Sequence, residues 1–148
     1  MTESEDSRGP RPGPSKRVRI VQLDHPTLVA LADGDLAAAN LTSPVPLTGY
    51  FVDDEWRRVW QLRAAQVVLD LVSQAWITGV IWDEDGQRSV GRAGYHGPPG
   101  DVGMVEVGYA VDPEFRRQGY ARAALEALLD RAAREPRAGL RAGVRSVG

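Results

Sequence analysis

The sequence predicts one α+β domain in which helices flank a mixed, mainly antiparallel sheet. Three short segments with strand-like alternation follow one another through residues 75–111, joined by turns rich in glycine and aspartate. Segments with apolar residues three or four positions apart lie before and after them, as in helices that cover a sheet. The chain has 148 residues, of which 43% are apolar, enough for a single core.

The first part of the chain predicts a tail, a strand and two helices. Residues 1–15 are polar and rich in proline and glycine, so we expect a disordered tail ahead of a domain over residues 16–148. Residues 17–23 alternate, which predicts a strand. Asp24 with a proline two positions later signals a helix start, and a second short helix is expected through Leu36.

The next segments predict a loop and a long helix. Prolines and a glycine make residues 41–52 a loop, after which Asp53 or Asp54 is suited to cap the helix. Apolar side chains at helical spacing then predict the buried face, which comprises Trp56, Val59, Trp60, Val67, Val68 and Leu71 together with Arg63. We interpret the tryptophans as core residues rather than as a cofactor site.

Three strands, a helix and a final strand are predicted after this helix. The strands are expected at 75–82, 89–95 and 104–111, and the Asp85-Gly86 turn signals a hairpin between the first two. Apolar residues at helical spacing predict a helix over 117–134, and a last strand is expected within 140–147.

The composition argues against several classes of site. The chain has no cysteine and two histidines, so neither a disulfide framework nor a metal site is expected. A net charge of −2 lacks the basic excess typical of nucleic-acid binding. No apolar run reaches the length of a membrane span, and the first residues lack the apolar centre of a signal peptide. We therefore expect a cytoplasmic protein without nucleic-acid or membrane partners.

The predicted start of the last helix has the features of an anion site. A helix start exposes backbone N–H groups without internal partners and carries a partial positive charge. Gly119 and the small Ala121 leave room for a phosphate to approach the backbone, and Arg116 and Arg117 add charged donors. By itself this pattern also fits a solvated basic helix start. The patterns of Walker loops and of dinucleotide-binding loops are absent.

The longer string EVGYAVDPEFRRQGYA, Glu106 to Ala121, closely resembles the signature of the GNAT superfamily of acyl-CoA-dependent N-acyltransferases. The family motif at the helix start has Gln or Arg, two variable residues, Gly, one variable residue, and Gly or Ala. Arg116, Gly119 and Ala121 match it. The opening Glu-Val-Gly-Tyr resembles the branch that acetylates the N-termini of ribosomal proteins. The predicted order of elements over residues 16–148 also fits.

This resemblance implies acetyl-CoA as the co-substrate and assigns residues to it. The backbone at the end of the third strand would pair with the pantetheine arm, which involves Tyr109, Ala110 and Val111. The loop at the helix start would hold the pyrophosphate, which involves Arg116, Arg117, Gln118, Gly119, Tyr120 and Ala121.

The implied chemistry is the transfer of an acetyl group to a primary amine, on a protein N-terminus or on a small molecule. Glu106 is the candidate catalytic base, because it shares a strand face with small residues. An exposed strand glutamate is the alternative interpretation. Tyr95 and His96 are candidates for the amine pocket, although a loop histidine explains His96 equally well. An oligomer is compatible with this assignment.

The sequence departs from the family after the last helix. The family continues with a fifth strand, another helix and two more strands, which usually bring an asparagine and a tyrosine to the cofactor. Here no asparagine follows Asn40 and no tyrosine follows Tyr120. We therefore expect a C-terminally truncated domain that lacks the last helix and strands. A non-catalytic CoA-binding module or an inactive fragment is the alternative.

Overall fold

The computed structural model describes residues 16–96 and 105–134 and the backbone of residues 142–146. The expected tail at 1–15 and most of the loop before the third predicted strand lie outside these residues. A five-stranded sheet forms the centre of the fold, in the order β1-β2-β3-β4-β5. Its strands are β1 (Val18–Val21), β2 (Gly79–Asp83), β3 (Arg88–Tyr95), β4 (Val105–Val111) and β5 (Ala142–Ser146).

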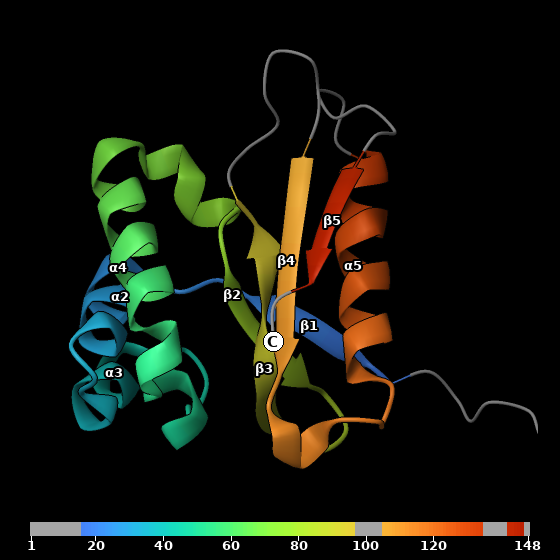
Figure 1. Ribbon diagram of the computed structural model, residues 1–148, viewed down its shortest axis with the longest axis horizontal. Helices are drawn as coiled ribbons and strands as arrows, with labels where there is room; N and C mark the ends of the chain where they lie inside the picture. Colours follow the sequence, from blue (N-terminus) through green and yellow to red (C-terminus); the bar gives the residue numbers. More distant parts are fainter. Residues whose placement is uncertain (1–15, 97–104, 135–141, 147–148) are drawn as a thin grey trace, which may run out of the picture.

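The sheet is mixed, as predicted. Consecutive strands from β1 to β4 pair antiparallel, whereas β5 pairs parallel with β4. Helices α2 (His25–Ala32), α3 (Leu36–Thr42) and α4 (Asp54–Leu69) lie on one side of the sheet, and α5 (Tyr120–Arg134) lies on the other (Figure 1). This arrangement confirms the expected α+β class.

Each face of the sheet has its own apolar core. On the α4 face, Trp56 and Trp60 are fully buried with Val80 and Ala110, so the interpretation of these tryptophans as core residues is confirmed. On the α5 face, Tyr95, Val107 and Tyr120 pack with Leu128. Strand β4 therefore contributes alternate residues to two cores, which places Glu106, Gly108 and Ala110 on the α4 face.

Several element boundaries differ from the prediction. The predicted loop at 41–52 contains the end of α3 and a 3-10 helix, Gly49–Val52. Strand β2 begins at Gly79 rather than at residue 75, because residues Leu71–Ala75 form another 3-10 helix. Helix α5 begins at Tyr120, three residues later than predicted.

The predicted apolar face of α4 extends too far. Val68 and Leu71 are 65% and 76% exposed. Helix α4 ends at Leu69, and the carboxylate of Asp70 accepts a hydrogen bond from the Val72 backbone N–H at 3.1 Å. This local hydrogen bond starts a new turn, so the residues after Leu69 leave the helical spacing that the apolar pattern continues.

Candidate active site

The segment between β4 and α5 forms a compact loop. The carboxylate of Asp112 accepts the Glu114 N–H at 2.9 Å, which starts the 3-10 helix Pro113–Phe115. Arg117 and Gly119 then take positive φ values of 63° and 90°. Glycine adopts such angles readily, whereas other residues do so rarely. The chain enters α5 directly after this reversal.

A hollow of about 270 Å³ opens on this loop. Most of the residues expected to hold pyrophosphate line this hollow. The full lining is Val111, Phe115, Arg116, Arg117, Gly119, Tyr120, Ala121 and Arg122. Gln118 is absent from the lining. Sequence reasoning missed Phe115 and Arg122, although Arg122 is signalled by its place in the first turn of the helix.

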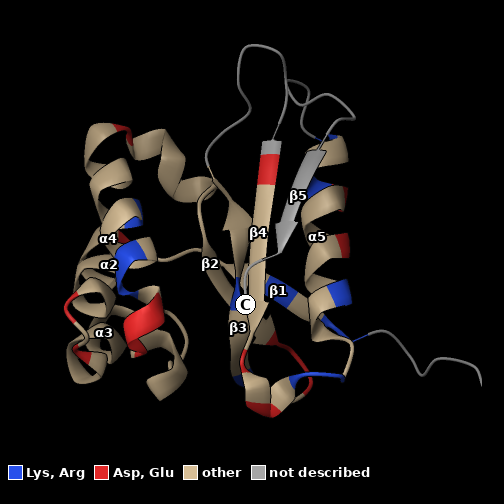
Figure 2. Cartoon of the chain, in the orientation of Figure 1, with Lys and Arg blue, Asp and Glu red and all other residues tan. Residues whose placement is uncertain are grey.

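The hollow is suited to an anion. The first helical hydrogen bond of α5 runs from the Ala123 N–H to the Gly119 carbonyl, so the N–H groups of residues 120–122 have no acceptor within the helix. The helix dipole adds positive potential at the same point. Figure 2 shows Lys and Arg residues in the loop before α5 and along α5. A phosphate in this hollow would meet both backbone donors and guanidinium groups.

Tyr120 anchors the start of α5 to the end of β2 and the start of β3, which lie at the same end of the sheet. Its buried hydroxyl donates to Asp83 Oδ2 at 2.5 Å and accepts from Arg88 Nη2 at 3.1 Å. Burial alone would raise the pKa of Asp83, but hydrogen bonds from Tyr120, from two backbone N–H groups and from Arg88 lower this pKa below its ordinary value. The Tyr120 side chain therefore fixes the loop, and only its backbone can face a ligand in the hollow.

The three residues expected at the pantetheine arm direct their backbone N–H and C=O groups to two different sides of β4. Asp112 N donates to Val90 O, and His96 N donates to Glu106 O, each at 2.9 Å. Backbone groups alternate in direction along a strand, so Ala110 is directed to β3, whereas Tyr109 and Val111 are directed toward the β5 edge. There the described pairing places Tyr109 opposite Ser146, and Arg116 Nε donates to the Val111 carbonyl at 3.0 Å.

Glu106 and His96 lie together at the other end of β4. The Glu106 carboxylate is half-exposed, and its Oε1 lies 3.4 Å from His96 Nδ1. The His96 carbonyl accepts from Gln66 Nε2 at 2.7 Å and from Arg63 Nη1 at 3.4 Å. Helix α4 thus holds the end of β3 in place, beside the Glu106 carboxylate.

The expectation that Tyr95 lines the amine pocket is corrected by the structure. Tyr95 is fully buried on the α5 face, where its hydroxyl donates to the Leu128 carbonyl and its ring packs on Trp76. Side chains of neighbouring strand residues point to opposite faces. Because His96 lies beside Glu106, the adjacent Tyr95 is directed away from both.

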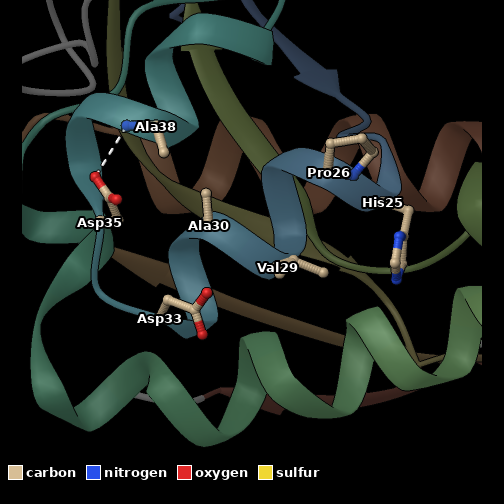
Figure 3. A pocket seen from close by; sticks show the side chains of 7 residues that line it. All are labelled: His25, Pro26, Val29, Ala30, Asp33, Asp35 and Ala38. Atoms are coloured by element: carbon tan, nitrogen blue, oxygen red, sulfur yellow. Dashed lines mark hydrogen bonds between the residues drawn. The ribbon is translucent and has the colours of Figure 1, made fainter.

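A second hollow lies on the outer side of the α2–α3 pair (Figure 3). Its lining comes from these two helices and their connection, and it consists of His25, Pro26, Val29, Ala30, Asp33, Asp35 and Ala38. The Asp35 carboxylate accepts the Ala38 N–H at 3.0 Å (Figure 3), so it serves as a helix cap. This hollow shares no residue with the loop hollow.

Two absences concern only the residues that the structure describes. No cluster of three or more His, Asp or Glu side chains there is arranged to hold a metal ion. Among the same residues, every helix is too short or too polar to cross a membrane.

Comparisons with known proteins bear on this site. The acetyltransferase (GNAT) domain family matches residues 18–146. The uncharacterized N-acetyltransferase YjdG of Bacillus subtilis (strain 168) is 26% identical over 121 residues, covering 78% of this chain and 68% of the relative.

Two solved structures are also similar. The ribosomal L7/L12 α-N-protein acetyltransferase RimL, in complex with coenzyme A, has a TM-score of 0.51 at 17% identity, with 84% of this chain and 68% of that chain covered. A spermidine N-acetyltransferase SpeG chimera from Vibrio cholerae and hSSAT has a TM-score of 0.45 at 16% identity, covering 78% of this chain. The chain spans 62% of the length of that SpeG chimera. The family match over nearly the whole described fold shows that this chain belongs to the GNAT acetyltransferase domain family.

Proposed function

We propose that the chain transfers an acetyl group from acetyl-CoA to a primary amine. One observation carries this proposal. Strand β4 bears the Glu106 carboxylate near its start and leads into the cationic hollow at the start of α5. A single strand thus joins a candidate base to a candidate phosphate site, as a CoA-dependent transfer to an amine requires.

The loop hollow would hold the CoA pyrophosphate. A Cβ atom built on Gly119 meets nothing closer than Lys16 Cγ at 3.7 Å, so the space over this backbone is open to a phosphate. Arg117 and Arg122 line the same hollow, and each guanidinium can donate to phosphate oxygens. The bound pantetheine would run along the edge of β4 beyond Tyr109, at Val111, where the described pairing with β5 has ended. Arg116 would then release the Val111 carbonyl to this arm.

The chemical step would use the amine as nucleophile. The neutral amine nitrogen attacks the thioester carbonyl carbon, a C–N bond forms, and the C–S bond breaks to release the CoA thiolate. Glu106 accepts the proton that the amine loses, while His96 holds the carboxylate in place. The released thiolate takes up a proton to give free CoA, which keeps atoms and charges balanced.

The experiment is a thiol-release assay with acetyl-CoA and a panel of primary amines, combined with calorimetric titration of CoA. We expect CoA binding and amine-dependent thiol release, and Glu106→Gln should remove most of the release while CoA still binds. CoA binding without release from any amine would favour a non-catalytic CoA-binding module. Absence of CoA binding would reject the proposal.

The amine panel follows from the relatives. The similar structures include a protein described as acting on spermidine and one described as acting on a ribosomal protein N-terminus. We therefore propose amines of either kind as acceptors. A cytoplasmic location and an oligomeric state stay predictions, as does the placement of the domain over residues 16–148.

A further inference from the structure

Several buried hydrogen-bond donors on the α4 face of the sheet have no hydrogen-bond partner among the described residues. The atoms are Arg92 Nε and Nη2, Arg63 Nε, Trp56 Nε1 and Tyr50 Oη. Arg92 is 3% exposed, although it carries a guanidinium group. All but the Tyr50 hydroxyl can only donate, so this cluster has more donors than acceptors.

The members of this cluster lie side by side. The Arg92 guanidinium carbon lies 4.0 Å from the centre of the Trp56 ring, and the Trp56 and Tyr50 rings are 5.7 Å apart, edge to face. Burial raises the pKa of Tyr50 to about 12, with the charge of Arg92 acting in the opposite direction. Burial also lowers the pKa of Arg92, and the nearby charge of Arg63 adds to this effect.

A buried charge of this kind calls for a counter-charge. Isolated ions are costly to bury, whereas paired and hydrogen-bonded ions are tolerated. The carboxylate whose charge acts on Arg92 belongs to Glu55, which is exposed. Stacking on Trp56 compensates part of the cost for Arg92 but leaves its N–H groups without acceptors. The described residues therefore contain two guanidinium groups with unpartnered N–H donors, which suits them to a small anion.

The cluster lies on the same sheet face as Glu106. Arg92 is opposite Ala110, which is four residues from Glu106 and thus about 13 Å away along the strand. Arg63 lies between, because its Nη1 reaches the His96 carbonyl at 3.4 Å. Arg63 is therefore nearer to Glu106 than Arg92 is, and an acceptor whose amine and carboxylate are several bonds apart would span from Glu106 to the guanidinium groups.

We propose that the acyl acceptor is a small amino carboxylate, such as a free amino acid with several bonds between its amine and carboxylate, whose carboxylate binds Arg92 and Arg63 while its amine faces Glu106. This inference rests on the proposed acetyltransferase function and names its substrate class. The unpartnered atoms are covered in the free protein. The partly buried Arg63 side chain therefore shifts when the acceptor binds, which opens access to Arg92 and lets both guanidinium groups donate to the carboxylate. The carboxylate then supplies the acceptors that the cluster lacks.

The test compares matched acceptors in the thiol-release assay. Each of a set of amino acids is measured against its own carboxamide, which has the same side chain and amine but no negative charge. We expect the acid to have a KM about ten- to a hundredfold lower than the amide, as for a charge-assisted hydrogen bond between buried groups. Equal KM values, or a preference for the amide, overturn the inference but leave the acetyltransferase function standing. No release from any amine contradicts the proposed function instead.

Two variants assign the effect to the cluster. Arg92→Gln and Arg63→Gln should raise KM for the acid by a much larger factor than KM for the amide. Arg19→Gln is the control, because Arg19 is an exposed arginine on β1 whose Nε lies 3.7 Å from Glu84. Loss of the acid preference in the control as well would overturn the assignment.

Anion binding, measured through the melting temperature, tests the same cluster without the Arg92→Gln variant. Acetate and inorganic phosphate are added to the wild-type protein at matched ionic strength, and the melting temperature is followed. We expect acetate to raise it more in the wild type than in Arg63→Gln. Phosphate bound in the loop hollow raises the melting temperature of both proteins equally. A difference between wild type and Arg63→Gln that is larger with phosphate than with acetate would therefore replace the carboxylate with a phosphate group and overturn the class proposed here. No difference between the two proteins overturns the site.

Discussion

Replacement of Tyr120 by phenylalanine is predicted to destabilise the fold. The hydroxyl is buried, donates to the nearly inaccessible Asp83 carboxylate at 2.5 Å and accepts from Arg88. Its loss removes two charge-assisted hydrogen bonds, one to Asp83 and one from Arg88. Asp83 keeps the Gly86 N–H at 3.1 Å and Arg88 Nε at 3.3 Å. Because these partners remain, we expect the free energy of unfolding to fall by about 1.5–3 kcal/mol and not more.

The pH dependence of the free energy of unfolding provides a second measurement of the hydrogen bond to Asp83. The Asp83 pKa is lowered in the folded protein, so its stabilisation is present above the ordinary carboxyl pKa and is lost as the pH falls through the folded pKa. The difference between wild type and Tyr120→Phe should therefore be largest near neutral pH. It should narrow at about pH 3, which lies below the ordinary aspartate pKa.

Urea unfolding at both pH values, followed by circular dichroism, measures this difference. Tyr109→Phe is the matched control, because the Tyr109 side chain is partly exposed and makes no side-chain hydrogen bond with the described residues. We expect the control to stay within about 0.5 kcal/mol of wild type, as surface substitutions usually do. An equally small change in Tyr120→Phe, or a difference that widens in acid, would refute the reasoning.

Three further predictions concern the proposed site. Gly119→Ala should weaken CoA binding about tenfold in calorimetry, because the φ of 90° at this position is strained for any side chain; unchanged affinity would contradict the loop assignment. Glu106→Gln should lower kcat in the thiol-release assay without changing CoA affinity, and a variant as fast as wild type would exclude Glu106 as the base. Tyr95→Phe should lower the free energy of unfolding by about 1–3 kcal/mol through the lost bond to Leu128 and leave the amine KM unchanged; a raised KM would restore Tyr95 to the amine pocket.

The parts of the site that are local in sequence were the most predictable. The hollow at the start of α5 arises within one short stretch, and its glycine and small helix residues show directly in the sequence. Even there the helix begins at Tyr120 rather than Arg117. The side chain of Tyr120 is directed into the core because of Asp83 and Arg88, which lie more than thirty residues earlier and carry no local signal.

Residues brought together from distant elements were not predictable in this way. Tyr95 and His96 are neighbours in sequence, but the pleat places them on opposite faces, and only a known register shows which of them lies beside Glu106. The cluster of buried donors without partners, which contains Tyr50, Trp56, Arg63 and Arg92, combines residues of a 3-10 helix, α4 and β3. The apolar pattern predicts that Trp56 is a core residue. It does not predict the stacking of Trp56 with Arg92, which depends on how α4 packs over the sheet.

The contact between Arg116 and the Val111 carbonyl has a consequence for the free protein. Val111 is the last residue of β4, and its carbonyl is directed to the edge that β5 covers only as far as Tyr109 in the described pairing. A bare strand edge invites a strand of another molecule and so promotes aggregation. By donating to this carbonyl, Arg116 removes one acceptor that such a strand would use. The same side chain can therefore protect the empty protein from self-association and withdraw when a ligand takes its place.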